Sequence, residues 1–338
     1  MCVRPTTRKI LSGNTVWLCA FWGLLFLLLL TLQLAVAAAP KVEKGVEVGH
    51  PPKYSMFTFL SQTPVANILY AVADPTPNDQ TKVRWERVPA QGRTRLPLNS
   101  EMKIDLSFAS LEHLNLLEQL YPCLVVYFSA SHLDFEDKHM RCARGFKGLR
   151  MIDMKDTLIT DKSLAQLGMF PELRILGLNR TDVTGTGFES LKNLHKVYDL
   201  GIEGINLKPG TIAKLKPLMA KLTSFDVSNT GLTKTDAAIL NELKSLQMLS
   251  ISGNRQIDDD CVKYLSQLNE LKTLSMHDTS ITEKSIPVLI KLPHLLRVIV
   301  REKKFWKSSK HQTKYGKVEF VDFARISNIP VDFFMDPK

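Results

Sequence analysis

The sequence predicts an α/β solenoid, with a curved parallel sheet on its concave side and helices on its convex side. Six consecutive segments of 24 or 25 residues begin at Leu149, Leu173, Val197, Leu222, Leu246 and Leu271. Within each segment the apolar spacing changes from a period near two to a period of three to four, which indicates a strand followed by a helix. One such unit cannot bury its apolar face alone, so neighbouring units must stack around a continuous core. We expect an N-terminal transmembrane or signal helix and a small N-terminal cap before this solenoid.

The core positions recur in every unit. The strand half has apolar residues at positions one, four and six, as in Leu149, Ile152, Met154; Leu173, Leu176, Leu178; Val197, Leu200, Ile202; Leu222, Phe225, Val227; Leu246, Leu249, Ile251; and Leu271, Leu274, Met276. The helix half has apolar residues three apart, from Leu164, Leu167 and Phe170 in the first unit to Ile286, Leu289 and Leu292 in the last. A polar turn residue lies between the halves at Thr157, Thr181, Thr230, Asn254 and Thr279, and Ile205 is the exception.

The stretches DMKDTLITDKSLAQL, LNRTDVTGTGFESL and MHDTSITEKSIPVL carry the pattern LxxLxLxxTxIT followed by xxxLxxLxxL. This pattern resembles the leucine-rich-repeat family, and is closest to its ribonuclease-inhibitor-like and bacterial strand-plus-helix subtype with units of about 24 residues. The resemblance covers residues 149–294, or 102–300 with degenerate end units. It implies a non-enzymatic module that binds a protein or peptide on its concave sheet, with no cofactor.

The ends of the solenoid have weaker spacing. Cys123, Val126 and Phe128, with Leu133, are expected to form a preceding repeat, and residues 110–120 a helix before it. Leu295, Val298 and Val300 are expected to form a final strand. The resulting domains are a signal segment (1–39), a spacer and cap (40–101), the solenoid (102–300), and a basic, aromatic tail and cap (301–338).

An apolar segment precedes the solenoid. Residues 16–39 carry no charge, whereas Arg4, Arg8 and Lys9 precede them. A helix of 24 residues reaches ~36 Å, enough to cross a ~30 Å hydrocarbon layer, and the preceding positive charge places the following domain outside the cytoplasm. Ala35-Val36-Ala37 also fits a signal-peptidase site. The protein is therefore expected either to be membrane-anchored through residues 16–39 and face the outside, or to be cleaved and secreted or periplasmic.

Charge is concentrated at the C-terminal end. The chain has a net charge of +10, and residues 301–317 hold seven basic residues against Glu302. The solenoid itself is close to neutral, which argues against a nucleic-acid partner because such partners need a basic stripe across the folded face. The tail also contains Phe305, Trp306 and Tyr315, a composition typical of either a contact with an anionic membrane or acidic partner, or a solvated extension. A membrane-associated organising protein is therefore the alternative to a recognition module.

The strand pattern also predicts the contact surface. Side chains alternate along a strand, so the third, fifth and seventh positions of each unit face away from the core. We expect the concave binding residues to be Asp153, Lys155, Ile175, Asn179, Asp199, Glu203, Asp226, Ser228, Met248, Ser250, Ser275 and His277. Their acidic bias predicts a partner with a basic segment, and the small fifth-position residues predict an open face.

No pattern of residues predicts catalysis or metal binding. The sequence has no GxSxG, HExxH or phosphate-loop motif, so an enzyme is the less favoured interpretation. Cys123, His132, His139 and Cys142 fit no zinc spacing, although a bridge between the two cysteines stays possible in an oxidising compartment. The Asn179-Arg180-Thr181 glycosylation sequon coincides with the turn pattern of the repeat, which makes it a weak signal.

Overall fold

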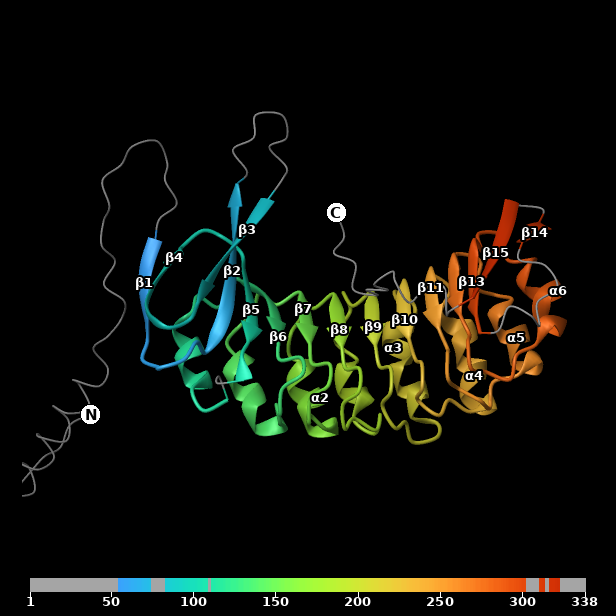
Figure 1. Ribbon diagram of the computed structural model, residues 1–338. Coiled ribbons are helices and arrows are strands. Elements are labelled where there is room, and N and C mark those ends of the chain that lie inside the picture. Colours follow the sequence, from blue (N-terminus) through green and yellow to red (C-terminus); the bar gives the residue numbers. More distant parts are fainter. Residues whose placement is uncertain (1–53, 74–82, 109–110, 302–309, 314–315, 323–338) are drawn as a thin grey trace, which may run out of the picture.

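The computed structural model of the protein describes residues 54–73, 83–108, 111–301, 310–313 and 316–322. Its strands lie side by side in one long sheet, and the helices lie along one side of that sheet (Figure 1). The predicted signal segment 1–39 lies outside the described residues. Within the described part of the chain, no helix has both the length and the apolar character needed to cross a membrane.

The long sheet has 13 strands, and ten neighbouring strands of it are parallel. These are β5 Met102–Leu106, β6 Val125–Ser129, β7 Met151–Asp153, β8 Ile175–Gly177, β9 Asp199–Gly201, β10 Ser224–Asp226, β11 Met248–Ser250, β12 Thr273–Ser275, β13 Arg297–Val300 and β15 Gly316–Asp322. Successive strands pair in the register that the repeat predicts; Leu176, for example, lies opposite Ile152 and Leu200. The predicted parallel sheet is therefore confirmed.

The N-terminal end of the sheet is antiparallel. Strand β2 (Ala66–Ala73) pairs with β5 and with β3 (Val83–Pro89), which is the edge strand of the sheet. A separate two-stranded sheet joins β1 (Tyr54–Phe59) and β4 (Gly92–Pro97). Phe57, Ile68 and Leu96 are fully buried in this region, so its core is continuous with that of the repeats.

The C-terminal end of the sheet closes with a hairpin. Strand β14 (Lys310–Thr313) pairs antiparallel with β15, and β15 pairs parallel with β13. Val318 and Phe320 are buried on the end of the solenoid. Part of the segment 301–338 is therefore an extension of the sheet rather than a solvated tail.

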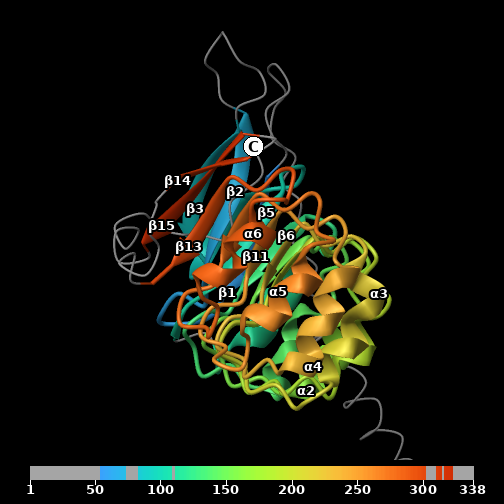
Figure 2. The same cartoon turned by 90° about the vertical axis from the view of Figure 1, so that its right-hand side faces the viewer.

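The helix halves are shorter and tighter than the periodicity predicts. They comprise η2 Leu114–Gln119, η3 Asp137–Ala143, α2 Asp161–Leu167, η4 Phe188–Leu191, η5 Thr211–Leu215, α3 Lys216–Met219, α4 Lys234–Ala237, η6 Ala238–Glu242, α5 Asp259–Leu265, η7 Glu283–Ser285 and α6 Ile286–Leu289, where η denotes a 3₁₀ helix. Side chains three apart eclipse on a 3₁₀ helix, so apolar triplets with a period of three suit it as well as they suit an α-helix. All the helices lie on one face of the sheet (Figure 2).

The predicted core positions are buried. Ile152, Leu176, Leu200, Phe225 and Leu249 line one shared interior beneath the sheet. The helix-half triplets bury their apolar residues in the same cluster, with Ile286 only partly covered. The stacked core is therefore confirmed.

The register predicted for the first repeat is wrong. Phe128 lies opposite Ile152, so it occupies position four rather than six. Val125 and Ala130 fill positions one and six and are fully buried, whereas Cys123 is exposed. Both registers place apolar residues at suitable spacing, and the weak apolar signal of Ala130 made the wrong one look better filled.

Polar side chains connect the repeats beside the core. The turn threonines bond within their own repeat, as where Thr157 Oγ1 donates to the Met154 carbonyl at 2.7 Å. Asn254 bridges two repeats, because its amide nitrogen donates to the carbonyls of Val227 and Ile251, both at 2.9 Å. On the helix side, Asp161 accepts hydrogen bonds from the next repeat, from Thr184 Oγ1 at 2.6 Å and the Gly187 amide at 2.8 Å. Such bonds fix the stacking geometry of neighbouring units.

Candidate binding face

The face of the sheet turned away from the helices is called the concave face below. Its residues form three rows across the strands. The third-position row runs through Tyr127, Met151, Ile175, Asp199, Ser224, Met248 and Thr273, and the fifth-position row through Ser129, Asp153, Gly177, Gly201, Asp226, Ser250 and Ser275. The seventh-position residues Lys155, Asn179, Glu203, Ser228, Ser252 and His277 follow at the carboxyl ends of the strands. All twelve predicted binding residues therefore lie on this face.

The concave face is less open than predicted. Met151, Asp153, Lys155, Glu203, Met248 and His277 are half-buried. The middle of the face is buried at Ile175, Asn179, Asp199, Asp226, Ser228, Ser250 and Ser275. Strand alternation correctly assigns these side chains to the face, but it carries no information about how deeply each one lies.

The serines that follow β10 and β11 bond to serines on the next strand. Ser228 Oγ and Ser250 Oγ lie 2.6 Å apart, and Ser252 Oγ lies 2.9 Å from Ser275 Oγ. Their hydroxyl groups are therefore satisfied within the sheet.

Two glycines lie on the concave face at β8 and β9. Gly177 and Gly201 lie opposite each other on β8 and β9. A Cβ atom at Gly201 would come within 2.7 Å of Asn179 Oδ1, so only glycine leaves room for the amide group there. That oxygen accepts a hydrogen bond from the Glu203 amide at 2.9 Å. Asn179 is thus buried and bonded, which disfavours its use as a glycosylation site.

Two carboxylates beside these glycines are buried. Asp199 is 6% exposed and Asp226 is 8% exposed. Asp226 Oδ1 accepts a hydrogen bond from the Ser228 amide at 3.0 Å. Burial raises the pKa of Asp199 from 3.8 to about 6, against a hydrogen bond from the Ser224 hydroxyl and with a further increase from the charge of Asp226. Burial likewise raises the pKa of Asp226 to about 6, against the hydrogen bonds from Ser228.

No ion pair relieves these two carboxylates within the described residues. The concave cations nearest in sequence are Lys155 and Arg180, and Arg180 binds Asp156 Oδ2 at 2.8 Å and Glu203 Oε2 at 3.4 Å. The buried Ser224 hydroxyl lies next to Asp199, and its hydrogen bond to that carboxylate lowers the pKa of Asp199 in opposition to burial. In the described part of the chain, the two carboxylates at β9 and β10 are therefore balanced by hydrogen bonds and not by an ion pair.

The expected binding residues leave out Tyr127, Asp105 and Ser224, which also lie on this face. Tyr127 occupies the third-position row beside Met151, and burial raises its pKa to about 12. It was missed because the first repeat was assigned to the wrong register. Asp105 of β5 lies opposite Ser129 in the fifth-position row, and burial raises its pKa. Asp105 was left out because strand β5 does not have the repeat spacing. Ser224 occupies the third position of its repeat, but a serine there does not by itself indicate binding.

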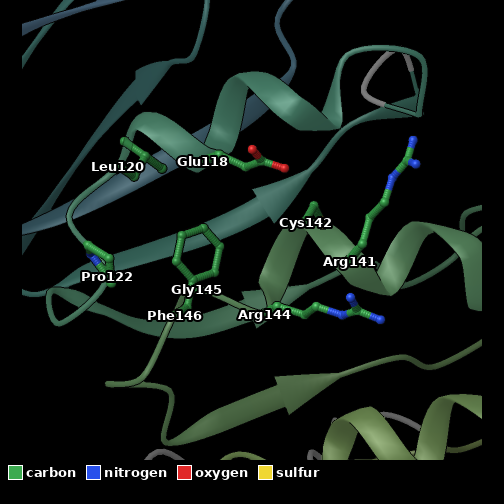
Figure 3. Close-up of a pocket in the computed structure, with 8 residues that line it drawn as sticks. All are labelled: Glu118, Leu120, Pro122, Arg141, Cys142, Arg144, Gly145 and Phe146. Carbon is green, nitrogen blue, oxygen red and sulfur yellow. The ribbon is translucent and has the colours of Figure 1, made fainter. Parts of the chain in front are cut away.

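A small cavity lies on the helix side, between η2 and η3. It has a volume of about 290 Å³ and is lined by Glu118, Leu120, Pro122, Arg141, Cys142, Arg144, Gly145 and Phe146. The side chains of Arg141 and Arg144 extend away from Phe146 (Figure 3). Burial raises the pKa of the Cys142 thiol to about 12, so the reactive thiolate is scarce at neutral pH. The cavity therefore has no activated nucleophile.

The cysteines and histidines that were considered as metal ligands lie in and beside the first repeat. Cys123 and Cys142 are both free thiols, and His139 Nδ1 accepts a hydrogen bond from the Glu136 amide at 2.9 Å. His132 Nδ1 lies 2.7 Å from Asp156 Oδ2. Among the residues that the structure describes, no three His, Cys, Asp or Glu side chains gather as metal ligands.

The stacked strand-turn-helix units have the leucine-rich-repeat fold that the sequence resemblance implies. No protein-family model matches the chain. Among solved structures, it is similar to internalin C2 from Listeria monocytogenes, with 20% identity, coverage of 64% of this chain and 79% of the other, and a TM-score of 0.42. Internalin F from the same organism shows 15% identity, coverage of 62% and 70%, and a TM-score of 0.43.

A plant peptide hormone receptor, RGFR1, in complex with RGF2, gives 19% identity, coverage of 52% of this chain and 32% of the other, and a TM-score of 0.37. At these scores the likeness says nothing about what this chain binds. The fold assignment rests on the repeat geometry of the chain itself.

Proposed function

We propose that the protein is a non-catalytic recognition module that binds a protein or peptide along its concave face. The observation that carries the proposal is the chemistry of that face, where apolar side chains adjoin carboxylates that no described cation neutralises. Isolating a carboxylate from water is unfavourable unless a cation or hydrogen bonds compensate. A partner with a basic segment would supply that compensation.

The dimensions of the face suit a polypeptide. Ten parallel strands at ~4.8 Å spacing make a surface roughly 43 Å long, several times the size of a metabolite. Ile175, Met151 and Met248 lie on this surface and offer apolar contacts at separate points along it. An extended chain that crosses the strands would meet these apolar contacts and the carboxylates in turn.

The proposal includes a location on the outer side of a membrane. It is supported by the uncharged residues 16–39 and the basic residues before them. We favour an uncleaved anchor, for which the chain should resist extraction from membranes by alkaline carbonate. Release of a soluble chain that begins near Ala38 would instead show that the segment is cleaved.

Peptide selection tests the binding face. A display library of random peptides would be selected on the full-length protein, and the enriched peptides measured against two methionine variants. Met248→Arg changes the concave face, whereas Met169→Arg changes a residue after α2 that is 58% exposed. We expect Met248→Arg to weaken binding at least tenfold and Met169→Arg to leave it unchanged. Equal binding by both variants and the parent would contradict the proposal.

A further inference from the structure

The charged residues of the solenoid are segregated between its two edges. Seven loops within residues 144–296 lead from the helix of one repeat to the strand of the next. Because these strands are parallel, the seven loops lie together at one edge of the sheet, called the amino edge below. The amino edge holds ten basic residues against Glu172 and Glu270. The loops at the other edge, between residues 130 and 282, hold four basic and seven acidic residues.

The basic side chains of the amino edge face water. All ten are exposed, namely Arg144, Lys147, Arg150, Arg174, Lys192, Lys196, Lys221, Lys244, Lys272 and Lys291. Within the described residues, ion pairs engage two of them, Arg150 with Glu101 at 2.6 Å and Lys196 with Glu172 at 2.6 Å. Seven strands at ~4.8 Å spacing give this edge a length of roughly 30 Å. A solenoid that is close to neutral in total therefore carries a continuous basic edge.

Two apolar side chains accompany the basic ones. Met169 lies in the loop between α2 and β8 and is 58% exposed, and Leu296 lies directly before β13 and is 60% exposed. In water, an anionic polymer gives such side chains little to pack against, whereas the interfacial layer of a bilayer accepts them. Basic and apolar side chains on one edge therefore favour an anionic lipid surface over a nucleic acid or an anionic polysaccharide.

The chain also enters the fold at the amino edge. Tyr54 begins β1 and lies opposite Pro97 at the end of β4, which is followed closely by Met102 at the start of β5. Strand β5 runs parallel to the strands of the repeats, so its start lies at the amino edge. Residues 40–53 connect this entry point to the uncharged segment 16–39. An anchor formed by that segment would hold the amino edge, rather than the opposite edge, near lipid.

We propose that the amino edge of the solenoid lies on the surface of an anionic lipid membrane. This inference rests on the location beside a membrane that is part of the proposed function. The lysine and arginine side chains contact the anionic head groups, and Met169 and Leu296 enter the interfacial layer. Each basic residue near such a surface strengthens binding by about fivefold, an effect that falls off within a Debye length of ~8 Å. The sheet then stands upright on the membrane, and its concave face is open sideways to a partner.

Acetylation of lysines in the full-length protein tests this contact, because mass spectrometry measures each lysine separately. The protein is combined with vesicles of phosphatidylcholine, or of an equal mixture of phosphatidylcholine and phosphatidylglycerol. Lys192 and Lys291 report on the amino edge, whereas Lys208 and Lys284 lie at the other edge, roughly 20 Å away by strand geometry. We expect Lys192 and Lys291 to react roughly fivefold more slowly with the anionic vesicles than with the neutral ones. Lys208 and Lys284 should react equally with both, and high salt should remove the protection.

Two matched variants test whether the charge of the amino edge causes the protection. Each replaces three exposed lysines by glutamine, and none of the six has an ion pair in the described part of the chain. The first changes the amino edge through Lys147→Gln, Lys221→Gln and Lys244→Gln. The control changes the opposite side through Lys162→Gln, Lys208→Gln and Lys284→Gln. The first variant should lose most of the protection of Lys192 and Lys291, and the control should retain it.

Three results would overturn the proposal: equal acetylation with the two kinds of vesicle, equal protection at the two edges, or equal loss in the two variants. Protection of the amino edge by heparin or duplex DNA, but not by anionic vesicles, would also overturn it and indicate an anionic polymer. Carbonate extraction tests the anchor separately. If the chain is soluble but anionic vesicles still protect the amino edge, the lipid contact stands without the anchor. If the chain resists extraction and the edge is unprotected, the anchor stands and this inference fails.

Discussion

Replacing Asp226 by asparagine should stabilise the free protein at neutral pH. The Asp226 carboxylate is buried and has no described cation, and this environment raises its pKa from 3.8 to about 6. Asparagine has nearly the same shape, and its amide oxygen can still accept the hydrogen bond from the Ser228 amide. The substitution therefore removes the cost of burying a charge while it retains the local geometry.

The magnitude follows from the two pKa values. The difference between 3.8 and about 6, at 1.36 kcal/mol per pKa unit, corresponds to about 3 kcal/mol at pH 7.5. Some of this value is lost because asparagine also needs hydrogen bonds when buried, so we expect a gain of about 1 to 3 kcal/mol. The unfolded chain loses the Asp226 proton at lower pH than the folded chain does. The parent is therefore progressively destabilised between about pH 3.8 and pH 6 relative to Asp226→Asn, and the gain should vanish near pH 3.5.

Urea unfolding followed by circular dichroism at pH 3.5, 5 and 7.5 measures this gain, and Asp182→Asn is the control for an exposed position. Asp226→Asn should raise the free energy of unfolding at pH 7.5, less at pH 5, and not at pH 3.5. The corresponding rise in melting temperature at neutral pH is roughly 2 to 10 °C. A loss of stability at pH 7.5, or a gain that does not depend on pH, would show that the carboxylate has a structural partner, and would refute the reasoning.

Three further substitutions test the packing between repeats, with stability measured by urea unfolding. Asn254→Ala should lower the free energy of unfolding by about 3 kcal/mol, because it leaves the Thr230 and Leu232 amides and two carbonyls without their hydrogen bonds. The control Asn269→Ala, at an exposed position, should lower it by less than about 0.5 kcal/mol. Equal effects of the two substitutions would contradict the bridging role of Asn254. Gly168→Ala should lower the free energy of unfolding by at least about 2 kcal/mol, since the added Cβ would lie 2.1 Å from the Ser190 carbonyl oxygen. In the control Gly145→Ala the added Cβ meets no atom within 4 Å, so this substitution should be neutral. A neutral Gly168→Ala would disprove the close contact with Ser190. Hydrogen bonds from Thr184 and Gly187 lower the pKa of Asp161 despite its partial burial, so its contribution is present above about pH 4 and lost as pH falls through the lowered pKa. Asp161→Asn should therefore destabilise the protein by about 1 to 2 kcal/mol at pH 7 and by less at pH 2.5, and a constant cost would refute this linkage.

The repeat core was predictable because each core position needs an apolar residue in every unit. Leu176, Leu200 and Phe225 are apolar at one spacing, and stacking lets one rule apply to all of them. The first repeat was not predictable in register, because Val125 and Cys123 both begin an apolar series and only the neighbouring strand chooses between them. Pairing between strands is a long-range property, which the local spacing of one short segment does not contain.

The candidate site was predictable in position but not in character. Alternation along the strands placed Asp199 and Asp226 on the concave face. Their burial depends on the neighbouring strands. Glycine at position 201 likewise becomes necessary only once the Asn179 side chain lies against it. The raised pKa values of the two carboxylates thus depend on the assembled face rather than on any one repeat.

The repeats themselves provide an internal comparison for the two aspartates. The positions of Asp199 in the adjoining units hold Ile175 and Ser224, and those of Asp226 hold Gly201 and Ser250. The same backbone therefore accommodates neutral residues at each place, and the sheet does not require an acid there. Because the carboxylates are costly when buried and the fold has neutral alternatives at both positions, the stability of the sheet does not explain the presence of the two acids.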